Sequence, residues 1–383
     1  MRLRGIGPIF SAKSAVNMGC IHEEPGWPDL KWDEGHLAGD LAEVRFAQGR
    51  LLGRMEAMGF SLRDEAGLAT LTRDVVKSSA IEGERLDAAE VRSSIARRLG
   101  MDEGGSGPGS RAVEGIVEMM LDATGNARQP LTRERLFSWH ASLFPTGRTG
   151  MRRIVTGAWR ADETGPMQVV SGPLGRERVH FEAPAAHRLD AEMDLFLDWF
   201  ETPRVTDPIL FAGLAHLRFL TIHPFEDGNG RIARALSDLE LARAEGTERR
   251  FYSLSGQIER EREDYYRELE GAQRGGVDAT AWLGWFVGCL GRAILAAEET
   301  LAAVLRKAAV WELANRHPVN ERQRLVLNRL LDGFQGNLTS SKYAKLAKCS
   351  EDTALRDIRL LCDWGVLARN PGGGRSTSYA LAG

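Results

Sequence analysis

Apolar residues recur every three or four positions along most of the chain, which is the spacing that places them on one face of an α-helix. In residues 35–59, for example, Leu37, Leu41, Val44 and Leu51 fall on roughly one face. The same spacing predicts further helices at residues 61–81, 87–99, 111–124, 131–143, 186–201, 208–222, 231–244, 259–272 and 278–315. Neither a parallel-sheet alternation nor an internal repeat accompanies them, so the central body is predicted to be a helical bundle.

Residues 150–185 break this helical pattern. The runs 167–171 (MQVVS) and 178–182 (RVHFE) favour strands and flank a Gly-Pro-containing turn, so they predict a β-hairpin, the only strand pair expected before the C-terminus. Segment 103–110 holds four glycines in eight residues. It is predicted to be a linker rather than a phosphate loop, because no strand precedes it and no Lys-Ser/Thr follows it.

The C-terminal segment has a different pattern. Helices are predicted at 321–331, 340–348 and 351–362, and two strands at 366–369 and 378–381 flank a Gly-rich loop. Three helices with a turn between the second and third, followed by a hairpin, describe a winged helix-turn-helix.

Composition adds a few limits. The net charge of -3 gives no overall attraction to nucleic acid or membrane, and the 43% hydrophobic content is ordinary for a globular protein. The four cysteines lie far apart without a CxxC pair, which favours reduced thiols and a cytoplasmic location. No membrane span and no signal peptide are expected. Residues 1–26 are predicted to form a flexible leader, within which Met18 is an alternative start.

Candidate chemistry lies in residues 223–234, which read His-Pro-Phe-Glu-Asp-Gly-Asn-Gly-Arg-Ile-Ala-Arg. Pro224 ends the apolar helix before it, Gly228 and Gly230 permit a tight turn, and a new helix is predicted from about Arg231. A glycine-rich turn that leads into a helix is a ready anion site, because free backbone N–H groups and the positive end of the helix dipole face the ligand.

The side chains around this turn suit nucleotidyl transfer. Arg231 and Arg234 can hold phosphate oxygens, and Asp227 is a hard oxygen ligand suited to Mg²⁺. His223 can take a proton from an incoming hydroxyl at neutral pH. A plain helix–loop–helix turn is the alternative, but it would have to account for all these residues together.

This stretch resembles the signature of the Fic family, HxFx[D/E]GN[G/K]RxxR, at every defined position. The resemblance implies a mainly α fold. It also implies an enzyme that uses ATP and Mg²⁺ to transfer AMP to a Ser, Thr or Tyr hydroxyl of another protein. His223 is then the general base, Asp227 positions Mg²⁺, and Phe225 anchors the loop. Asn229 and the 228–230 backbone form the anion hole, and members that phosphorylate carry Lys where this chain has Gly230. The implied nucleotide-binding residues of the signature are Gly228, Asn229, Gly230, Arg231, Ile232, Ala233 and Arg234.

A second stretch, residues 78–83 (SSAIEG), resembles the inhibitory motif [S/T]xxxE[G/N] of the same family. Ser78 and Glu82 are four residues apart and so share a helix face. The resemblance implies that Glu82 pairs with Arg234 and occupies the arginine that would hold the γ-phosphate. The alternative is a simple helix end, with Gly83 as its terminating glycine.

The resemblance also implies a use for the hairpin and for the helix that follows the signature. The hairpin corresponds to a flap that captures the target backbone as an added strand. Tyr266 is the preferred contact to adenine, whereas Tyr265 points about 100° away on the helix and is expected in the core. His216 is expected to be a packed, hydrogen-bonded histidine, and the stripe around Trp282 and Trp285 is expected to be core.

The predicted domains are the leader 1–26, an N-terminal helical domain with the inhibitory helix at 27–102, a Fic catalytic core at 111–315 and the winged segment at 318–383. Residues 320–383 carry ten basic and six acidic side chains, which is compatible with DNA but equally with protein docking. The target protein is unidentified, and self-modification and a homodimer are among the expectations. Removal of AMP by the same site, and a DNA-binding regulator with an ATP-sensing core, are the alternative functions.

Overall fold

The computed structural model describes residues 19–101, 109–162, 165–173, 176–203, 205–331, 334, 336–371 and 377–382. The chain divides into two compact units, Met1–Ala297 and Glu298–Gly383, and the division falls inside the long helix α11. The expected linker at 103–110 and the alternative start at Met18 lie largely or wholly outside the described residues.

The first unit is mainly helical. Two short 3₁₀ turns, η1 (Ile21–Glu23) and η2 (Ala186–Arg188), accompany the α-helices. The helices are α1 (Glu34–Glu56), α2 (Phe60–Ile81), α3 (Ala88–Arg98), α4 (Arg111–Gly125), α5 (Arg133–Leu143), α6 (Leu189–Glu201), α7 (Pro208–Ile222), α8 (Asn229–Glu245), α9 (Leu254–Arg260), α10 (Arg262–Arg274) and α11 (Thr280–Ala314). The strands form two antiparallel hairpins, β1 (Arg148–Thr149) with β2 (Arg152–Arg153), and β3 (Gln168–Ser171) with β4 (Arg178–Glu182).

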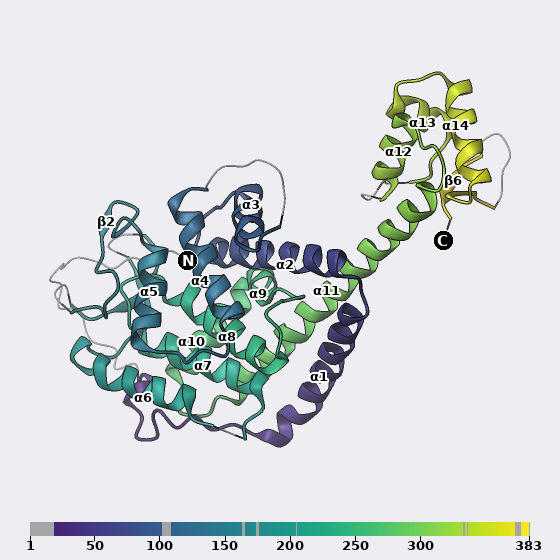
Figure 1. Cartoon of the computed structure of the whole chain (residues 1–383). Helices are drawn as coiled ribbons and strands as arrows, with labels where there is room; N and C mark the ends of the chain where they lie inside the picture. Colours follow the sequence, from purple (N-terminus) through teal and green to yellow (C-terminus); the bar gives the residue numbers. More distant parts are fainter. Residues whose placement is uncertain are drawn as a thin grey trace. The chain divides into compact units, whose positions relative to one another are not determined.

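Helices α7 and α8 pack against each other in the middle of this unit (Figure 1). Every residue of α7 after Pro208 is buried, as is every residue of α8 up to Ala242. A helix that is buried all round has no solvent face, so the remaining helices must cover it. The turn between these two helices, which carries the signature, is therefore held by the best-packed part of the unit.

The second unit contains α12 (Glu321–Leu331), α13 (Ser340–Ala347), α14 (Glu351–Asp363), β5 (Leu367–Arg369) and β6 (Tyr379–Leu381). Its core includes Val326, Leu327, Ile358 and Leu361, and the two strands pair antiparallel. This element order is the one predicted from the sequence.

Four details differ from the sequence-based expectations. Residues 19–26 do not extend the leader, because Cys20, Ile21 and His22 are buried and the His22 Nε2–H donates to the Glu182 carbonyl over 2.9 Å. The hairpin of β1 and β2 was not expected, since two-residue strands are too short to show alternation. The helix expected at 259–272 is two helices that break at Glu261, and α8 begins at Asn229 rather than near Arg231.

The segment Thr280–Ala302 of α11 is long and apolar enough, by length and composition, to cross a membrane, although 44% of its most apolar window is buried inside the protein. Trp282, Leu283 and Phe286 lie in that buried part, and Trp282 donates its indole N–H to the Gly213 carbonyl over 2.8 Å. The apolar character of this half of α11 is thus used by the core, as expected for the tryptophan stripe.

Candidate functional site

The signature forms a closed loop between α7 and α8. His223 ends α7 in the left-handed region, with φ of 52°, and Pro224 cannot continue the helix. Asn229 closes the loop, because its Oδ1 accepts the Phe225 N–H over 3.0 Å and its Nδ2 donates to the Phe225 carbonyl over 2.8 Å. The Asn229 side chain is thus used to close the loop, and its backbone N–H remains for the predicted anion hole.

Two buried residues fix the loop from below. The ring of Phe225 is fully buried and stacks on His140 with centroids 4.2 Å apart, and burial of such a ring stabilises the fold by roughly 1.5–3 kcal/mol. Arg160 donates from Nε to the His223 carbonyl over 2.8 Å and from its backbone N–H to the Pro224 carbonyl over 2.9 Å. The sequence did not point to Arg160, since nothing in its neighbourhood marks it as buried.

His223 is held in the tautomer that a general base requires. Its Nδ1 lies 3.3 Å from the Leu220 carbonyl, and because a carbonyl only accepts, Nδ1 carries the proton and Nε2 keeps its lone pair. Burial, reinforced by the charge of Arg160, lowers the pKa of His223 to about 4. The imidazole is therefore neutral at physiological pH and able to accept a proton.

The start of α8 is open for an anion. Gly228 precedes the helix with φ of 83°, and no side chain caps the first turn, so the backbone N–H groups of residues 229–231 have no capping partner. A Cβ at Gly228 would lie 2.9 Å from Phe144 Cε2, and one at Gly230 would lie 2.1 Å from Glu82 Oε1. Gly228 is required by its positive φ and by the Phe144 ring, whereas a side chain at residue 230 would displace the Glu82 carboxylate. Ile232 and Ala233 are fully buried, so only their backbone can belong to the site.

Arg234 is paired with the end of α2. Its Nε donates to Ser78 Oγ over 3.0 Å, and its Nη2 donates to the Ser78 carbonyl over 3.0 Å and to Glu82 Oε1 over 2.8 Å. The Arg234 side chain is 1% exposed and that of Glu82 is 9% exposed. Among the described residues the buried Nη1 of Arg234 has no hydrogen-bond partner.

A second carboxylate, that of Glu84, lies outside the inhibitory motif and pairs with the other arginine of the signature, Arg231. Arg231 donates from Nη1 to Glu84 Oε2 over 2.7 Å, and its guanidinium lies 4.9 Å from the Phe144 ring centroid. Gly83 has φ of 85°, and the N–H of Glu84 returns to the Ser79 carbonyl over 3.0 Å. The helix-end interpretation of Glu-Gly is thus also right, and this ending is what aims both glutamates at α8.

Asp227 lies beside the open helix start. Its Oδ1 accepts the Gly228 N–H over 2.6 Å, and its Oδ2 accepts the Thr149 hydroxyl over 2.6 Å. No group of three or more His, Cys, Asp or Glu residues occurs in the described part of the chain that could hold a metal alone. A single carboxylate suits Mg²⁺, which usually takes one or two carboxylates and completes its shell with water and substrate phosphates. Thr149 was not foreseen, because its strand was not.

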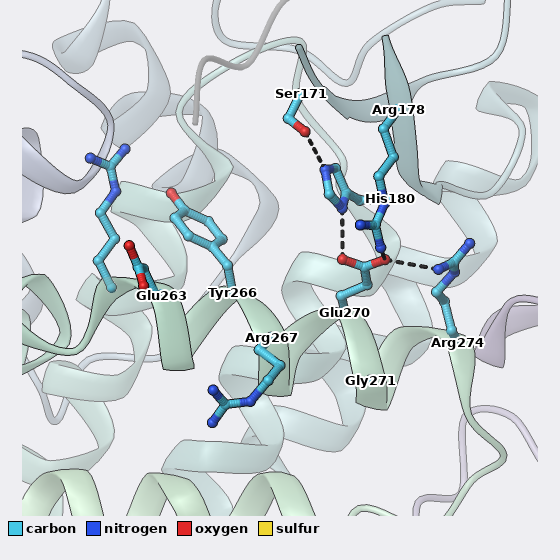
Figure 2. A pocket seen from close by; sticks show the side chains of 10 residues that line it. Ser171, Arg178, His180, Glu263, Tyr266, Arg267, Glu270, Gly271 and Arg274 are labelled. Atoms are coloured by element: carbon cyan, nitrogen blue, oxygen red, sulfur yellow. Dashed lines mark hydrogen bonds and ion pairs between the residues drawn. The ribbon is translucent and has the colours of Figure 1, made fainter.

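A cavity of about 790 Å³ adjoins this site, between the β3–β4 hairpin and α10 (Figure 2). Tyr266 lines it, and the Tyr266 hydroxyl lies 3.5 Å from the Ile81 carbonyl, next to Glu82 in sequence. Tyr265 is 1% exposed and shares a 2.9 Å hydrogen bond with His216 Nε2, whose Nδ1 lies 3.0 Å from Ser237 Oγ. Tyr265 and His216 thus take the core positions expected of them.

The comparisons with known proteins agree with the family resemblance of the signature. The sequence profile of the Fic/DOC family matches residues 130–241, and that of a domain of unknown function, DUF4172, matches residues 20–101. The chain contains a Fic domain. A crystal structure of a Fic family protein from Desulfovibrio desulfuricans G20, 23% identical, covers 91% of this chain and 96% of its own with a TM-score of 0.50, which supports the fold.

Curated relatives match over the Fic domain. Protein adenylyltransferase Fic of Nematostella vectensis is 33% identical over 134 residues, which is 34% of this chain and 28% of that protein. Protein adenylyltransferase fic-1 of Caenorhabditis elegans is 28% identical over 172 residues, which is 44% of this chain and 31% of that protein. The chain therefore spans about a third of the length of these relatives. DNA binding, self-association and cytoplasmic location stay predictions.

Proposed function

We propose that the protein transfers AMP from ATP to hydroxyl side chains of other proteins. The observation that carries the proposal is a neutral, buried imidazole with a free Nε2, held beside an uncapped helix start that bears two buried arginines. The similarity of the Fic domain to proteins named adenylyltransferases supports this reaction class.

In the proposed reaction, a hydroxyl oxygen of the target attacks the α-phosphorus of ATP and gives its proton to His223 Nε2. The bond from the α-phosphorus to the bridging oxygen of the β-phosphate breaks, and pyrophosphate leaves. The backbone N–H groups at residues 229–231 face the phosphates, and Arg231 and Arg234 bind the β- and γ-phosphate oxygens. Mg²⁺, held by Asp227 and the phosphates, would neutralise charge during transfer.

The resting enzyme is inhibited by its own N-terminal domain in this proposal. Glu82 and Glu84 each take one of the two arginines that the phosphates need, over 2.8 Å and 2.7 Å. The Arg234 Nε–H is also unavailable to a phosphate, because it donates to Ser78 Oγ. A bound ATP would have to displace at least the Glu82 carboxylate before the γ-phosphate could reach Arg234.

The test is label transfer from α-³²P-ATP with Mg²⁺ to proteins of a cell lysate. Glu82→Gly is expected to raise the rate at least about tenfold, since one charge-assisted contact is worth roughly 1.5–3 kcal/mol. Glu24→Gly, at an exposed glutamate, is the matched control. Adding His223→Ala to Glu82→Gly should lower the rate by about 100-fold or more, whereas His36→Ala, at an exposed histidine, should not.

Label that appears from γ-³²P-ATP instead would assign a kinase reaction and contradict the proposal. Absence of label from α-³²P-ATP with the Glu82→Gly protein would also contradict it. A rate that His223→Ala leaves unchanged would remove the histidine from the mechanism.

A further inference from the structure

A buried arginine of α7, Arg218, lines a second cavity, of about 200 Å³. Arg218 is 3% exposed, and among the described residues its buried Nε–H has no hydrogen-bond partner and its guanidinium forms no ion pair. The buried arginines Arg160, Arg231, Arg234 and Arg250, by contrast, each donate to at least one protein oxygen. Arg218 is therefore a buried donor that the protein itself leaves without an acceptor.

Arg218 is charged at physiological pH. Burial lowers its pKa to about 10, and the negative charges of Glu192 and Asp29 act in the opposite direction. Glu192 already accepts the Trp27 indole N–H over 2.9 Å and Arg188 Nη2 over 2.5 Å. A cation that has been taken out of water is costly unless an anion with good hydrogen-bond geometry lies close to it. An anionic ligand would supply that partner.

The packing of Arg218 leaves the edge of its guanidinium available. Its guanidinium carbon lies over the Trp199 ring, 4.5 Å from the centroid, so the indole covers one face. The N–H groups of a guanidinium lie in its plane and form a fork that matches the two oxygens of a carboxylate. A face covered by an aromatic ring and a free edge are thus compatible with carboxylate binding.

A second donor without a partner lines the same cavity. The indole N–H of Trp32 is buried, and it has no hydrogen-bond partner in the described part of the chain. Arg218 and Trp32 can only donate, so a ligand that satisfies both must accept. Much of the remaining lining is apolar, from Trp199, Phe211 and Leu214. Donors set among apolar walls suit a carboxylate with a short apolar body.

The lining also limits the charge and the size of the ligand. Among the described lining residues Arg218 is the only cation and Asp29 the only acid. A dianion would therefore keep one charge without a cation and would be repelled by Asp29, whereas a monoanion is neutralised by Arg218. A volume of about 200 Å³ accommodates roughly six water-sized groups, since each takes about 30 Å³. This is the size of a monocarboxylate with three or four carbons.

We propose that this cavity binds a small monocarboxylate, whose oxygens accept from Arg218 and from the Trp32 indole N–H. Pro28 and Trp32 belong to the region that matches DUF4172, and Trp199 and Arg218 belong to the Fic domain, so the ligand contacts both. Ligand sites are frequent between domains. The bound carboxylate stabilises the folded first unit in proportion to the logarithm of its concentration. The inference does not depend on AMP transfer.

The experiment titrates the full chain with sodium propionate, by calorimetry and by thermal unfolding at constant ionic strength. One propionate is expected to bind per chain, and the unfolding midpoint of the first unit is expected to rise with propionate concentration. Propionamide has the same size without the charge, and sodium chloride has the charge without the planar pair of oxygens. Neither is expected to bind or to raise the midpoint. Disodium malonate, a dianion, should bind more weakly than propionate.

Two variants test the assigned donors. Arg218→Met keeps the apolar stem and removes the charge, and it should weaken propionate binding at least about tenfold. Arg359→Met, at an exposed arginine of the second unit, is the matched control. Without propionate, Arg218→Met should unfold at a midpoint no lower than that of the wild type, because it removes a buried cation that has no partner.

Trp32→Phe removes the indole N–H and keeps most of the ring. It should weaken propionate binding severalfold. Trp311→Phe, at a half-buried tryptophan of the second unit, is its control. This variant also tests the site if Arg218→Met fails to fold.

Several outcomes would overturn the inference. Absence of propionate binding to the wild type removes the site. Equal binding by Arg218→Met, or by Trp32→Phe in the event that Arg218→Met is unfolded, removes the assigned donors. An equal response to propionamide or to chloride contradicts a carboxylate site. Each of these results leaves the proposed AMP transfer standing, because label transfer tests it separately.

Discussion

The N-termini of helices α14 and α8 differ in where the groups that neutralise their positive dipole ends come from. Helix α14 supplies its own anions, since Ser350 Oγ accepts the Thr353 N–H over 3.3 Å and Glu351 and Asp352 lie in its first turn. Helix α8 has no capping side chain and carries two arginines in its first two turns. Asp227 Oδ1 lies 3.8 Å from Arg231 Nη2, but the nearest anions of the two arginines are Glu82, 152 residues from Arg234 in sequence, and Glu84, 147 residues from Arg231.

The first turn of α14 is capped by residues of its own segment, whereas the arginines of α8 are paired with carboxylates that a ligand could replace. The capping groups of α14 are covalently adjacent to it and cannot be exchanged for a ligand. The carboxylates of Glu82 and Glu84 belong to a segment at the end of another helix, so a phosphate can compete for the same arginines. Because Arg231 and Arg234 are 4% and 1% exposed, each must keep an anionic partner, either glutamate or phosphate.

The largest expected effect comes from breaking the more buried of the two pairs. Arg234→Ala leaves Glu82 nearly buried without its cation, and removal of one partner of a buried pair costs roughly 3–5 kcal/mol of unfolding free energy. The double variant Arg234→Ala/Glu82→Gly should recover much of that loss. Urea unfolding of the two single variants and the double variant gives the coupling energy. A double variant as unstable as the sum of the singles would show that the pair is not coupled.

The sequence allowed the start of α8 to be predicted, because the turn, the glycines and both arginines are adjacent in the chain. Glu82 was found through a resemblance to a motif. Glu84, Thr149 and Arg160 were not found, because each acts on the loop through contacts between residues 63 or more apart. The periodicity of apolar residues predicts local secondary structure and cannot predict contacts between residues so far apart in sequence.

The pH dependence of stability should report on the buried histidines at α8, namely His216 in α7 and His223 in the loop that follows, whereas the turn before α14 contains no histidine. Burial lowers the pKa of His223 to about 4 and that of His216 to about 3. In the unfolded chain both groups have a pKa near 6.5, so between pH 6.5 and 4 the unfolded state binds more protons. Stability is therefore fully present above pH 6.5 and is lost as the pH falls.

At pH 5 each of these histidines is expected to cost on the order of 1–2 kcal/mol relative to pH 7.5. The measurement is the unfolding free energy at both pH values for the wild type and for His216→Gln. The variant should lose less on acidification, since it removes one group that gains a proton on unfolding. Equal losses in both proteins would mean that His216 is not neutral for the reason given.

A smaller effect is expected at the complete helix start. Ser350→Ala removes the cap of α14 and should lower the stability of the second unit by about 1 kcal/mol. Affinity for an ATP analogue should not change, because the anions of α14 have no counterpart in nucleotide binding. Thermal unfolding and a binding titration of the same sample measure the two quantities. A weaker nucleotide affinity in this variant would contradict the separation drawn here.

The smallest effect is expected from the more exposed of the two carboxylates at α8. The Glu84 side chain is 46% exposed, against 9% for Glu82, so water screens its pair with Arg231 and the pair is worth at most about 1 kcal/mol. Glu84→Gln should therefore strengthen binding of an ATP analogue by no more than about fivefold, and Glu82→Gly should strengthen it more. Glu56→Gln, at an exposed glutamate that ends α1, is the matched control. A gain from Glu84→Gln equal to that from Glu82→Gly would mean that Arg231, rather than Arg234, limits access of the phosphates to α8.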